Sequence, residues 1–169
     1  NRIKSNTDRL SRLINDLLDL SRIESGRVEV RPTTLPLTAL TEEVAEHMRA
    51  LAAEKLIRIE VPSSDPSVTV WADRDKVTQV LVNLIGNAVA HGDPDKPVTV
   101  TAGAEALRAW VQVHNEGPPI PQELQSALFD PFRMGERSSR SPAGLGLGLY
   151  ISNEVVHRHG GQIEIRSTA

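Results

Sequence analysis

Residues 144–149 read GLGLGL, and residues 83–87, well upstream, read NLIGN. Alternating glycines that open a helix present backbone N–H groups to phosphate. Two asparagines four positions apart, Asn83 and Asn87, place two neutral carboxamides on one face of a helix. Carboxamide oxygens and bare N–H groups are suited to holding a magnesium–nucleotide. The two segments together therefore predict a nucleotide-binding domain.

The composition is that of one ordinary domain, with 39% hydrophobic and 24% charged residues in a chain of 169. A net charge of -3 gives no reason to expect a nucleic-acid partner. The chain has no cysteine, which excludes disulfides and thiolate metal sites and fits a reducing compartment. No apolar run is long enough to span a bilayer, and no signal peptide is visible. We expect a cytoplasmic location without direct membrane contact.

Residues 2–25 predict one long amphipathic helix. Its apolar residues approximate a heptad seam that is wider than a lone surface helix needs, so the sequence favours a coiled-coil-like helix that packs in a bundle. The alternative is a terminal helix packed on its own domain. The seam consists of Ile3, Leu10, Leu13, Ile14, Leu17, Leu18, Leu20 and Ile23.

Helices and strands alternate from residue 37 onward, which predicts an α+β fold, a two-layer α/β sandwich with a mixed sheet covered by helices. The helices expected cover residues 37–55, 73–91 and 122–128, followed by one that begins at Gly144 or Gly146 and ends at Gly160. The strands expected cover residues 57–61, 68–71, 98–101, 107–114 and 162–166. Asp73 is the expected N-cap of the second of these helices.

The asparagine helix carries a polar stripe. At about 100° per residue, Asn83, Asn87 and His91 fall within roughly 80° of one another, at the edge of the apolar face. Asparagine has a modest helix propensity, so two on one stripe need a reason. Solvent exposure or a hydrogen bond to a nearby strand is one explanation, and a carboxamide oxygen on Mg²⁺ is the other.

The predicted strand that ends near residue 114 leads into a stiff loop. Asn115 is followed by Gly117 and then by prolines at positions 118, 119 and 121. Such a loop can hold Asn115 rigidly against a flat heterocycle, with backbone room at Gly117. An ordinary strand-to-helix turn is the alternative interpretation.

The glycine-rich segment matches neither of two familiar phosphate loops. Its G-x-G-x-G spacing and the polar loop before it differ from a dinucleotide-binding fingerprint, and the Lys-Ser/Thr ending of a Walker loop is missing. What remains is a helix N-terminus suited to phosphate oxygens. Arg133, Arg137 and Arg140 lie in the preceding loop, which can close as a lid over a phosphate. A solvated basic loop is the alternative.

These segments give the chain a resemblance to the ATP-binding catalytic domain of sensor histidine kinases, most similar to the phytochrome-type branch. Four family boxes occur in the expected order, and the resemblance covers nearly the whole chain. They are the asparagine box at 83–88 (NLIGNA), the first glycine box at 115–121 (NEGPPIP), the phenylalanine box at 128–132 (LFDPF) and the second glycine box at 144–149.

The resemblance implies the Bergerat ATP-binding fold, with ATP between the asparagine helix and the flexible lid. It implies that Asn87 supplies an oxygen to Mg²⁺ and that Asn83 lies beside the phosphates. No catalytic side chain is assigned within the chain. The residues expected to bind ATP are Asn83, Asn87, His91, Asn115, Gly117, Arg133, Arg137, Arg140, Gly144, Gly146, Leu147 and Gly148.

Three positions depart from the family pattern. Asn115 stands where the family usually has an Asp that accepts a hydrogen bond from the adenine amino group; an Asn still accepts, but without charge assistance. Pro119 replaces a usual glycine and stiffens the turn. Ala90 stands where many members place a phosphate-contacting Lys, so we expect that contact to be absent or to come from a lid arginine.

The resemblance also divides the chain. Residues 1–26 look like the second helix of a dimerisation and phosphoacceptor hairpin, 27–36 are a linker and first strand, and 37–169 are the ATP-binding catalytic domain, apparently truncated at its C-terminus. The implied function is transfer of the γ-phosphoryl of Mg–ATP to a histidine, for relay to the receiver domain of a response regulator. The implied parent is a homodimer through its hairpin.

None of the five histidines stands in the expected acceptor pattern of His followed by an acidic residue. The acceptor is therefore expected upstream of Asn1, and the chain is predicted to bind Mg–ATP without autophosphorylating. The histidines are His47, His91, His114, His157 and His159.

Two other functions stay open. A gyrase/MutL-like ATPase would place a Glu where this chain has Asn83, and an Asn does not act as a general base at neutral pH. The second alternative is not an enzyme but a non-catalytic dimeric output module. It is motivated by the departures from the family pattern at Asn115, Pro119 and Ala90 and by the apolar seam of the N-terminal helix. Absence of nucleotide binding would favour that module.

Overall fold

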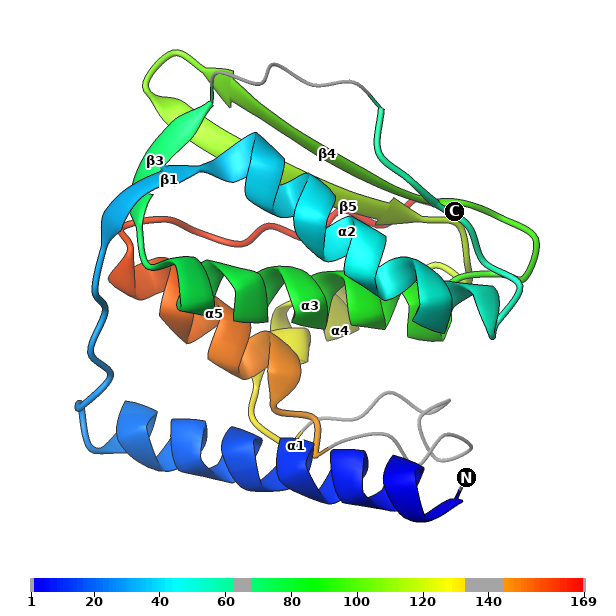
Figure 1. Cartoon of the computed structure of the whole chain (residues 1–169), viewed down its shortest axis with the longest axis horizontal. Helices are drawn as coiled ribbons and strands as arrows, with labels where there is room; N and C mark the ends of the chain where they lie inside the picture. Colours follow the sequence, from blue (N-terminus) through cyan, green and yellow to red (C-terminus); the bar gives the residue numbers. More distant parts are fainter. Residues whose placement is uncertain (1, 63–67, 133–144, 169) are drawn as a thin grey trace. The chain divides into compact units, whose positions relative to one another are not determined.

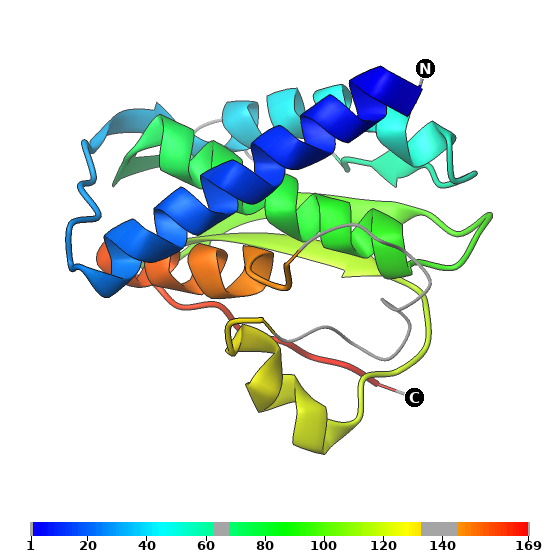
Figure 2. The same ribbon diagram turned by 90° about the horizontal axis from the view of Figure 1, so that it is seen from below.

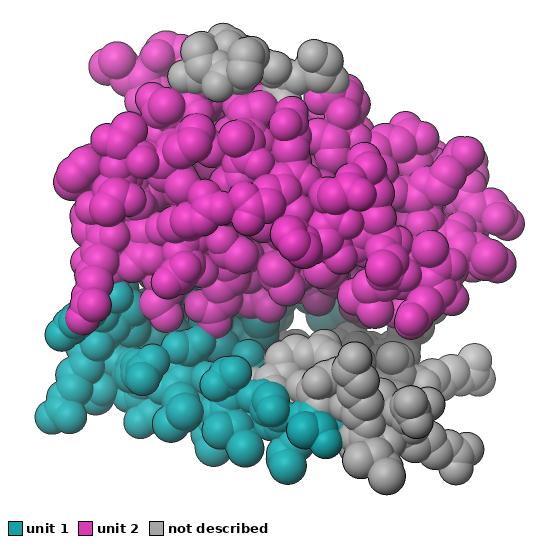
Figure 3. Space-filling model, in the orientation of Figure 1, with its two compact units in different colours: residues 1–29, 120–167 teal, residues 30–119, 168–169 magenta. Residues whose placement is uncertain are grey.

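The computed structural model describes residues 2–62, 68–132 and 145–168. They form two compact units (Figure 3). Unit 1 comprises residues 1–29 and 120–167, and unit 2 comprises residues 30–119 with 168–169. Unit 2 therefore contains the asparagine box and the start of the first glycine box, whereas unit 1 contains the phenylalanine box and the second glycine box.

Unit 2 is a two-layer structure of helices on strands. The strands β2 (Ile59–Glu60), β4 (Val98–Glu105) and β5 (Arg108–Asn115) form one sheet in that order, in which β2 is parallel to β4 and β5 is antiparallel to it. The helices α2 (Leu37–Ala53) and α3 (Arg74–His91) lie side by side on one face of this sheet (Figures 1 and 2). The predicted mixed sheet covered by helices is confirmed.

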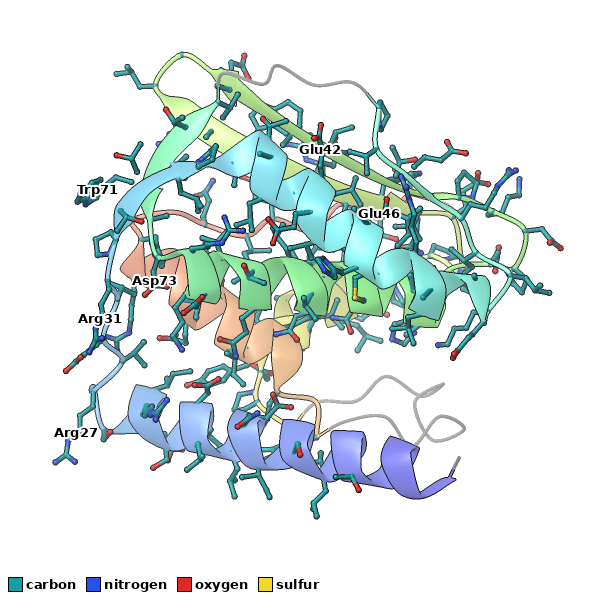
Figure 4. The ribbon with its side chains drawn as sticks, viewed as in Figure 1. Arg27, Arg31, Glu42, Glu46, Trp71 and Asp73 are labelled. Atoms are coloured by element: carbon teal, nitrogen blue, oxygen red, sulfur yellow. The ribbon has the colours of Figure 1, made fainter. Side chains whose placement is uncertain are left out.

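A second, two-stranded sheet closes one end of unit 2. It pairs β1 (Thr33–Pro36) with β3 (Thr69–Ala72) in antiparallel register, so that Leu35 lies opposite Val70. Leu35 is buried, whereas Trp71 on the neighbouring position of β3 stays 68% exposed and points outward (Figure 4). The alternation of buried and exposed positions is that of a strand with one face on the core.

The core of unit 2 consists of aliphatic side chains from both layers. The side chains of β4 that face the helices are buried, because successive strand residues point to opposite faces of the sheet. On the other face, Trp110 lies across the sheet over Gly103, where a side chain would clash with the indole ring. The most deeply buried side chains of this core include Leu40, Val44, Leu81, Ile85, Val89, Val98 and Val100.

The helix α3 begins where the sequence predicts. The carboxylate of Asp73 accepts a hydrogen bond from the backbone N–H of Lys76 at 3.1 Å, which caps the helix. Its other oxygen accepts one from the backbone N–H of Arg31 at 2.8 Å (Asp73 and Arg31 are labelled in Figure 4). One side chain therefore both caps the asparagine helix and holds the segment that leads into β1.

Unit 1 is helical among its described residues. It contains α1 (Arg2–Glu24), the short α4 (Gln122–Gln125), the 3₁₀ turn η1 (Ser126–Phe129) and α5 (Gly148–Arg158). The helices α1 and α5 are in contact. Leu20 and Ile23 near the end of α1 are buried. Upstream, α1 exposes four apolar side chains, each at least half accessible: Leu10, Ile14, Leu17 and Leu18.

Several sequence predictions require correction. Residues 162–166 form no strand, although Ile163 and Ile165 are the more buried positions of an alternating pattern. The last helix begins at Gly148, later than expected from Gly144 or Gly146, and ends at Arg158. Gly160 follows the C-cap with φ +75°, in agreement with its predicted role in ending this helix. The helix expected over 122–128 is divided into α4 and η1. The predicted long helix over residues 2–25 is confirmed as α1, and its packing in a bundle stays a prediction.

Within the ranges that the structure describes, no helix combines the length and the apolar character needed to cross a membrane.

Candidate functional site

The asparagine stripe of α3 lies at the edge of the buried face, as predicted. Leu81 and Ile85 are buried in the core, whereas the side chains of Asn83 and Asn87 are half-buried and that of His91 is exposed. Because the two asparagines follow each other by one helical turn, their carboxamides share one side of the helix. This geometry presents two neutral oxygens from a rigid element, partly shielded from water.

The loop after β5 touches the end of α3. A Cβ atom on Gly117 would lie 2.6 Å from the carbonyl oxygen of His91, closer than side-chain carbons approach an oxygen. A Cβ atom on Gly92 would lie 2.7 Å from the carbonyl oxygen of Ala88. Glycine at position 117 therefore lets the first glycine box approach the end of the asparagine helix. The tight contact at Gly92 is with a carbonyl of its own helix, and a Cβ atom there would lie 3.7 Å from the Cβ of Asn115.

Main-chain hydrogen bonds hold this arrangement in place. The N–H of Asp93 donates to the carbonyl oxygen of Glu116 at 2.8 Å, and the Lys96 ammonium lies 3.2 Å from the Glu116 carboxylate. Asn115 is the last residue of β5 and lies opposite Val98 of β4 in the sheet register. The backbone at Asn115 is therefore fixed by the sheet on one side and by the turn after α3 on the other.

Sequence reasoning missed Gly92 and Asp93 as parts of this site. The signal that could have found them is the position of Gly92 directly after His91, where a glycine commonly follows a helix. Its φ of -65° shows that close approach, not left-handed backbone, is the reason for glycine here. The N–H of Gly92 continues the helix by donating to the Ala88 carbonyl oxygen at 2.8 Å.

In unit 1, the second glycine box leads into α5. Gly146 has φ +70°, a conformation that residues with a side chain rarely adopt, and Leu147 is fully buried at the N-cap. The N–H of Ile151 donates to the Leu147 carbonyl oxygen at 2.9 Å, and Gly148 is the first helical residue. The first turn carries no acidic side chain, so the positive end of the helix dipole is not neutralised from within the helix.

The remaining predicted positions lie outside the described residues. They are Arg133, Arg137, Arg140 and Gly144. Their assignment to the lid and to the phosphates stays a prediction.

The asparagine oxygens of α3 are the candidate metal ligands in the described part of the chain. No group of three or more His, Asp or Glu side chains there could hold a metal ion. The oxygens of Asn87 and Asn83 fit the preference of Mg²⁺ for hard oxygen ligands, since this ion usually keeps several waters and takes phosphate oxygens as well.

Two of the histidines have structural roles. The Nδ1 atom of His47 lies 2.8 Å from the Glu43 carbonyl oxygen, and that of His159 lies 2.8 Å from the Val155 carbonyl oxygen. Because a carbonyl oxygen only accepts, each Nδ1 carries the hydrogen and donates it to the helix. The His159 bond satisfies a carbonyl oxygen in the last turn of α5.

Comparison with known proteins agrees with these features. Residues 72–169 match the family described as histidine kinase-, DNA gyrase B- and HSP90-like ATPases. The chain belongs to this family. The matched residues begin just before α3 and include both glycine boxes.

Similar curated proteins include a bacteriophytochrome and a sensor-type histidine kinase. The chain is 32% identical over 165 residues to a bacteriophytochrome of Pseudomonas aeruginosa, covering 96% of this chain and 22% of that protein. It is 34% identical over 169 residues to the circadian input-output histidine kinase CikA of Synechococcus elongatus, covering 98% of this chain and 22% of that protein. The chain thus spans about a fifth of the length of these relatives.

Solved structures show the same fold. The full-length kinase ShkA in complex with AMPPNP superposes with a TM-score of 0.80 at 28% identity, over 94% of this chain and 33% of ShkA. The histidine kinase ThkA in complex with the response regulator TrrA gives a TM-score of 0.69 at 29% identity, over 95% of this chain and 45% of the matched chain. The ATPase-family domain is therefore of the histidine-kinase type, and the predicted resemblance is confirmed.

Proposed function

We propose that this chain is the ATP-binding catalytic part of a sensor histidine kinase, which supplies the γ-phosphoryl group for transfer to a histidine. The observation that carries the proposal is the close approach of Gly117 to the end of α3, where an added Cβ atom would lie 2.6 Å from the His91 carbonyl oxygen, so that the first glycine box and the asparagine helix meet in unit 2. The family match and the similarity to an AMPPNP-bound kinase support it.

Each unit contributes its own assigned residues. In unit 2 we assign Asn83, Asn87 and His91 of α3, with Asn115 and Gly117 after β5, to the nucleotide, and Asn87 to Mg²⁺. In unit 1 we assign the second glycine box, including Gly146, Leu147 and Gly148, to phosphate oxygens, because a helix N-terminus without acidic side chains favours an anion. The lid arginines Arg133, Arg137 and Arg140, with Gly144, complete the assignment.

Mg²⁺ would neutralise charge on the triphosphate, which is the main demand of phosphoryl transfer. The protein's contribution is positioning: α3 holds two carboxamides at fixed spacing, and the glycine loop holds Asn115 at the end of a strand. Asn83 does not activate water, which favours transfer to a histidine over hydrolysis.

The test is calorimetric titration of the chain with ADP and ATP, with and without Mg²⁺, beside an Asn87→Ala variant. We expect binding that weakens in the variant and without Mg²⁺. Asn15→Ala is the matched control, because Asn15 is exposed on α1 and has no assigned role. The nucleotide affinity of this variant should equal that of the unmodified chain. If no nucleotide binds at millimolar concentration, the proposal fails and the non-catalytic output module takes its place.

The partners follow from the same proposal. A response regulator receiver domain is the expected acceptor of the phosphoryl group downstream, supported by the ThkA–TrrA complex among the similar structures. A homodimer of the parent through residues 1–26 is supported by the exposed apolar side chains of α1, namely Leu10, Ile14, Leu17 and Leu18. Residues 27–36 would then link this helix to the catalytic domain, residues 37–169, in the cytoplasm.

We also propose that the chain does not phosphorylate itself. None of its five histidines is followed by an acidic residue, and the imidazoles of His47 and His159 already donate to helix carbonyls. Incubation with labelled ATP should leave no acid-labile phosphate on the protein. Labelling that persists in base and is lost in acid would overturn this statement.

A further inference from the structure

The backbone of Asn115 is anchored, but the orientation of its side-chain carboxamide is only weakly restrained. The backbone is anchored by pairing with β4 and by the hydrogen bond from Asp93 to Glu116. Among the described residues, the one hydrogen bond of the side chain runs from Nδ2 to the Glu116 carbonyl oxygen at 3.4 Å. That distance is longer than the 2.7–3.2 Å typical of N–H···O bonds, so this bond restrains the amide only weakly.

The neighbours of the amide leave it room to turn. Asn115 lies between Gly92 and Gly117, neither of which has a side chain. A Cβ atom on Gly92 would lie 3.7 Å from the Asn115 Cβ, and one on Gly117 would lie 3.3 Å from Nδ2. Because both sides are bare, rotation about the last side-chain bond, which exchanges the oxygen with the nitrogen, meets no side chain from these two positions. The side chain is half-buried, so each orientation is partly shielded from water.

The two orientations match two different purines. Adenine presents an amino donor at its 6-position and an acceptor at N1, whereas guanine and hypoxanthine present an oxygen acceptor at the 6-position and a donor at N1. A carboxylate only accepts, so it pairs with the 6-amino group and repels a 6-oxygen. A carboxamide has both a donor and an acceptor, so it pairs with either base after a half-turn.

We propose that Asn115 makes the nucleotide site tolerant of 6-oxopurines, so that the chain accepts inosine and guanosine nucleotides as well as adenosine nucleotides. The inference rests on the proposed function, which assigns Asn115 to the base. With Asn in place of Asp, the side chain at position 115 no longer acts only as a hydrogen-bond acceptor. The site therefore loses its discrimination between an amino group and an oxygen at the purine 6-position.

The experiment compares the affinities of ADP and inosine 5′-diphosphate by calorimetry in the presence of Mg²⁺. In the unmodified chain the two dissociation constants should agree within about tenfold, since each base leaves no polar group unpaired at the 6-position. In Asn115→Asp, inosine diphosphate should weaken by about 10- to 100-fold relative to ADP, because the carboxylate faces an acceptor. Asn15→Asp, with the same charge change on exposed α1, should leave the ratio unaltered.

The outcomes separate the two proposals. If ADP binds and inosine diphosphate binds more than a hundredfold more weakly to the unmodified chain, the inference is overturned while the proposed function stands. If the ratio in Asn115→Asp equals that in the control, Asn115 does not read the 6-position and the inference also fails. If neither nucleotide binds, the proposed function itself fails.

Guanosine diphosphate adds one further comparison. It differs from inosine diphosphate only by the 2-amino group, so equal binding of the two would extend the tolerance to guanine. Tight binding of inosine diphosphate with guanosine diphosphate more than a hundredfold weaker would overturn the guanosine part of the proposal. The comparison within the unmodified chain needs no variant, so a folding defect in Asn115→Asp would not leave the inference untested.

Discussion

Gly117 lies so close to His91 that a Cβ atom on the glycine would be 2.6 Å from the carbonyl oxygen of the histidine. The loop that follows β5 and the end of α3 thus meet backbone to backbone. Both segments carry residues assigned to the nucleotide, so the spacing of the site depends on the absence of one side chain. This relationship leads to the first prediction.

Gly117→Ala should destabilise the chain by about 1–3 kcal/mol, because the added methyl forces the loop away from a backbone atom that has little freedom to yield. Nucleotide affinity should fall as well, since the loop carries Asn115. Gly86→Ala is the matched control: on α3 the new methyl would meet nothing closer than the Met48 Cε at 3.8 Å, and alanine favours the helix by about 0.5–1 kcal/mol. Urea unfolding measures the stability of both variants. A Gly117→Ala variant as stable as the unmodified chain would contradict the close approach.

Asp73→Ala should cost about 1–2 kcal/mol of stability, because it removes the acceptor of two backbone N–H groups, those of Lys76 and Arg31. Asp73→Asn keeps an acceptor at the N-cap and should lose less. The neighbouring exposed carboxylate of Asp75 provides the control, since Asp75→Ala removes charge from the same first turn without removing the cap. Thermal unfolding of the three variants measures the loss of stability in each. Equal losses in Asp73→Ala and Asp75→Ala would contradict the role of Asp73 as the cap.

Ala106→Gly should stabilise the hairpin between β4 and β5 by up to about 1 kcal/mol. Ala106 is the first of the two residues that join these strands and has φ +53°, where a Cβ atom is strained and glycine is not. The gain is reduced by the greater freedom that glycine has in the unfolded chain. Ala104→Gly, within β4, should destabilise instead. Denaturant midpoints of the two variants should therefore move in opposite directions, and a parallel shift would refute the strain.

Tyr150 offers a spectroscopic test of unit 1. Burial raises the pKa of its phenol above the ordinary value of 10.0, and the carboxylates of Glu154 and Glu24 raise it further. The fold favours the neutral phenol, so this contribution to stability is present below about pH 10 and is lost as the pH rises through the raised pKa. Since Tyr150 is the only tyrosine, its ultraviolet absorbance titration reports this one group.

Glu154→Gln should lower the midpoint of that titration toward the ordinary pKa, because it removes the stronger of the two repelling charges. Glu123→Gln, which is exposed on α4 and does not contribute to the shift, should leave the midpoint where it is. A Tyr150 midpoint at or below 10 in the unmodified chain would show that the phenol lies in water and would contradict its place beside Glu24 of α1.

The candidate site illustrates what a local pattern can predict. The helical period places Asn83 and Asn87 on one side of α3, and an Asp-capped start places the helix itself, because both depend on residues within a few positions of one another. The same is true of Gly160 at the end of α5. The close approach of Gly117 to His91 was not predicted, since it joins two segments whose distance is set by how β5 packs beside α3.

Residues 162–166 show that an alternating pattern does not by itself produce a strand. The alternation of Ile163 and Ile165 predicts a strand, and the half-buried and exposed positions do alternate as expected, yet no strand forms. A strand needs hydrogen bonds to a neighbour, and a period of two in the sequence does not supply the neighbour. Instead, the hydroxyl of Ser167, just beyond this segment, accepts a hydrogen bond from the N–H of Ile120 at 2.8 Å.

The sequence by itself determined the class of this protein through the order of its boxes, which resembles that of sensor histidine kinases. It also determined the cap of α3 and the polar stripe of that helix, which rest on short-range periodicity and side-chain chemistry. The tertiary structure alone decided which strands pair, that β1 joins β3 and that β2 lies parallel to β4, and that Asn115 stands between two bare glycines. These contacts link residues far apart in the chain, and their formation depends on packing of the whole core, which no local pattern encodes.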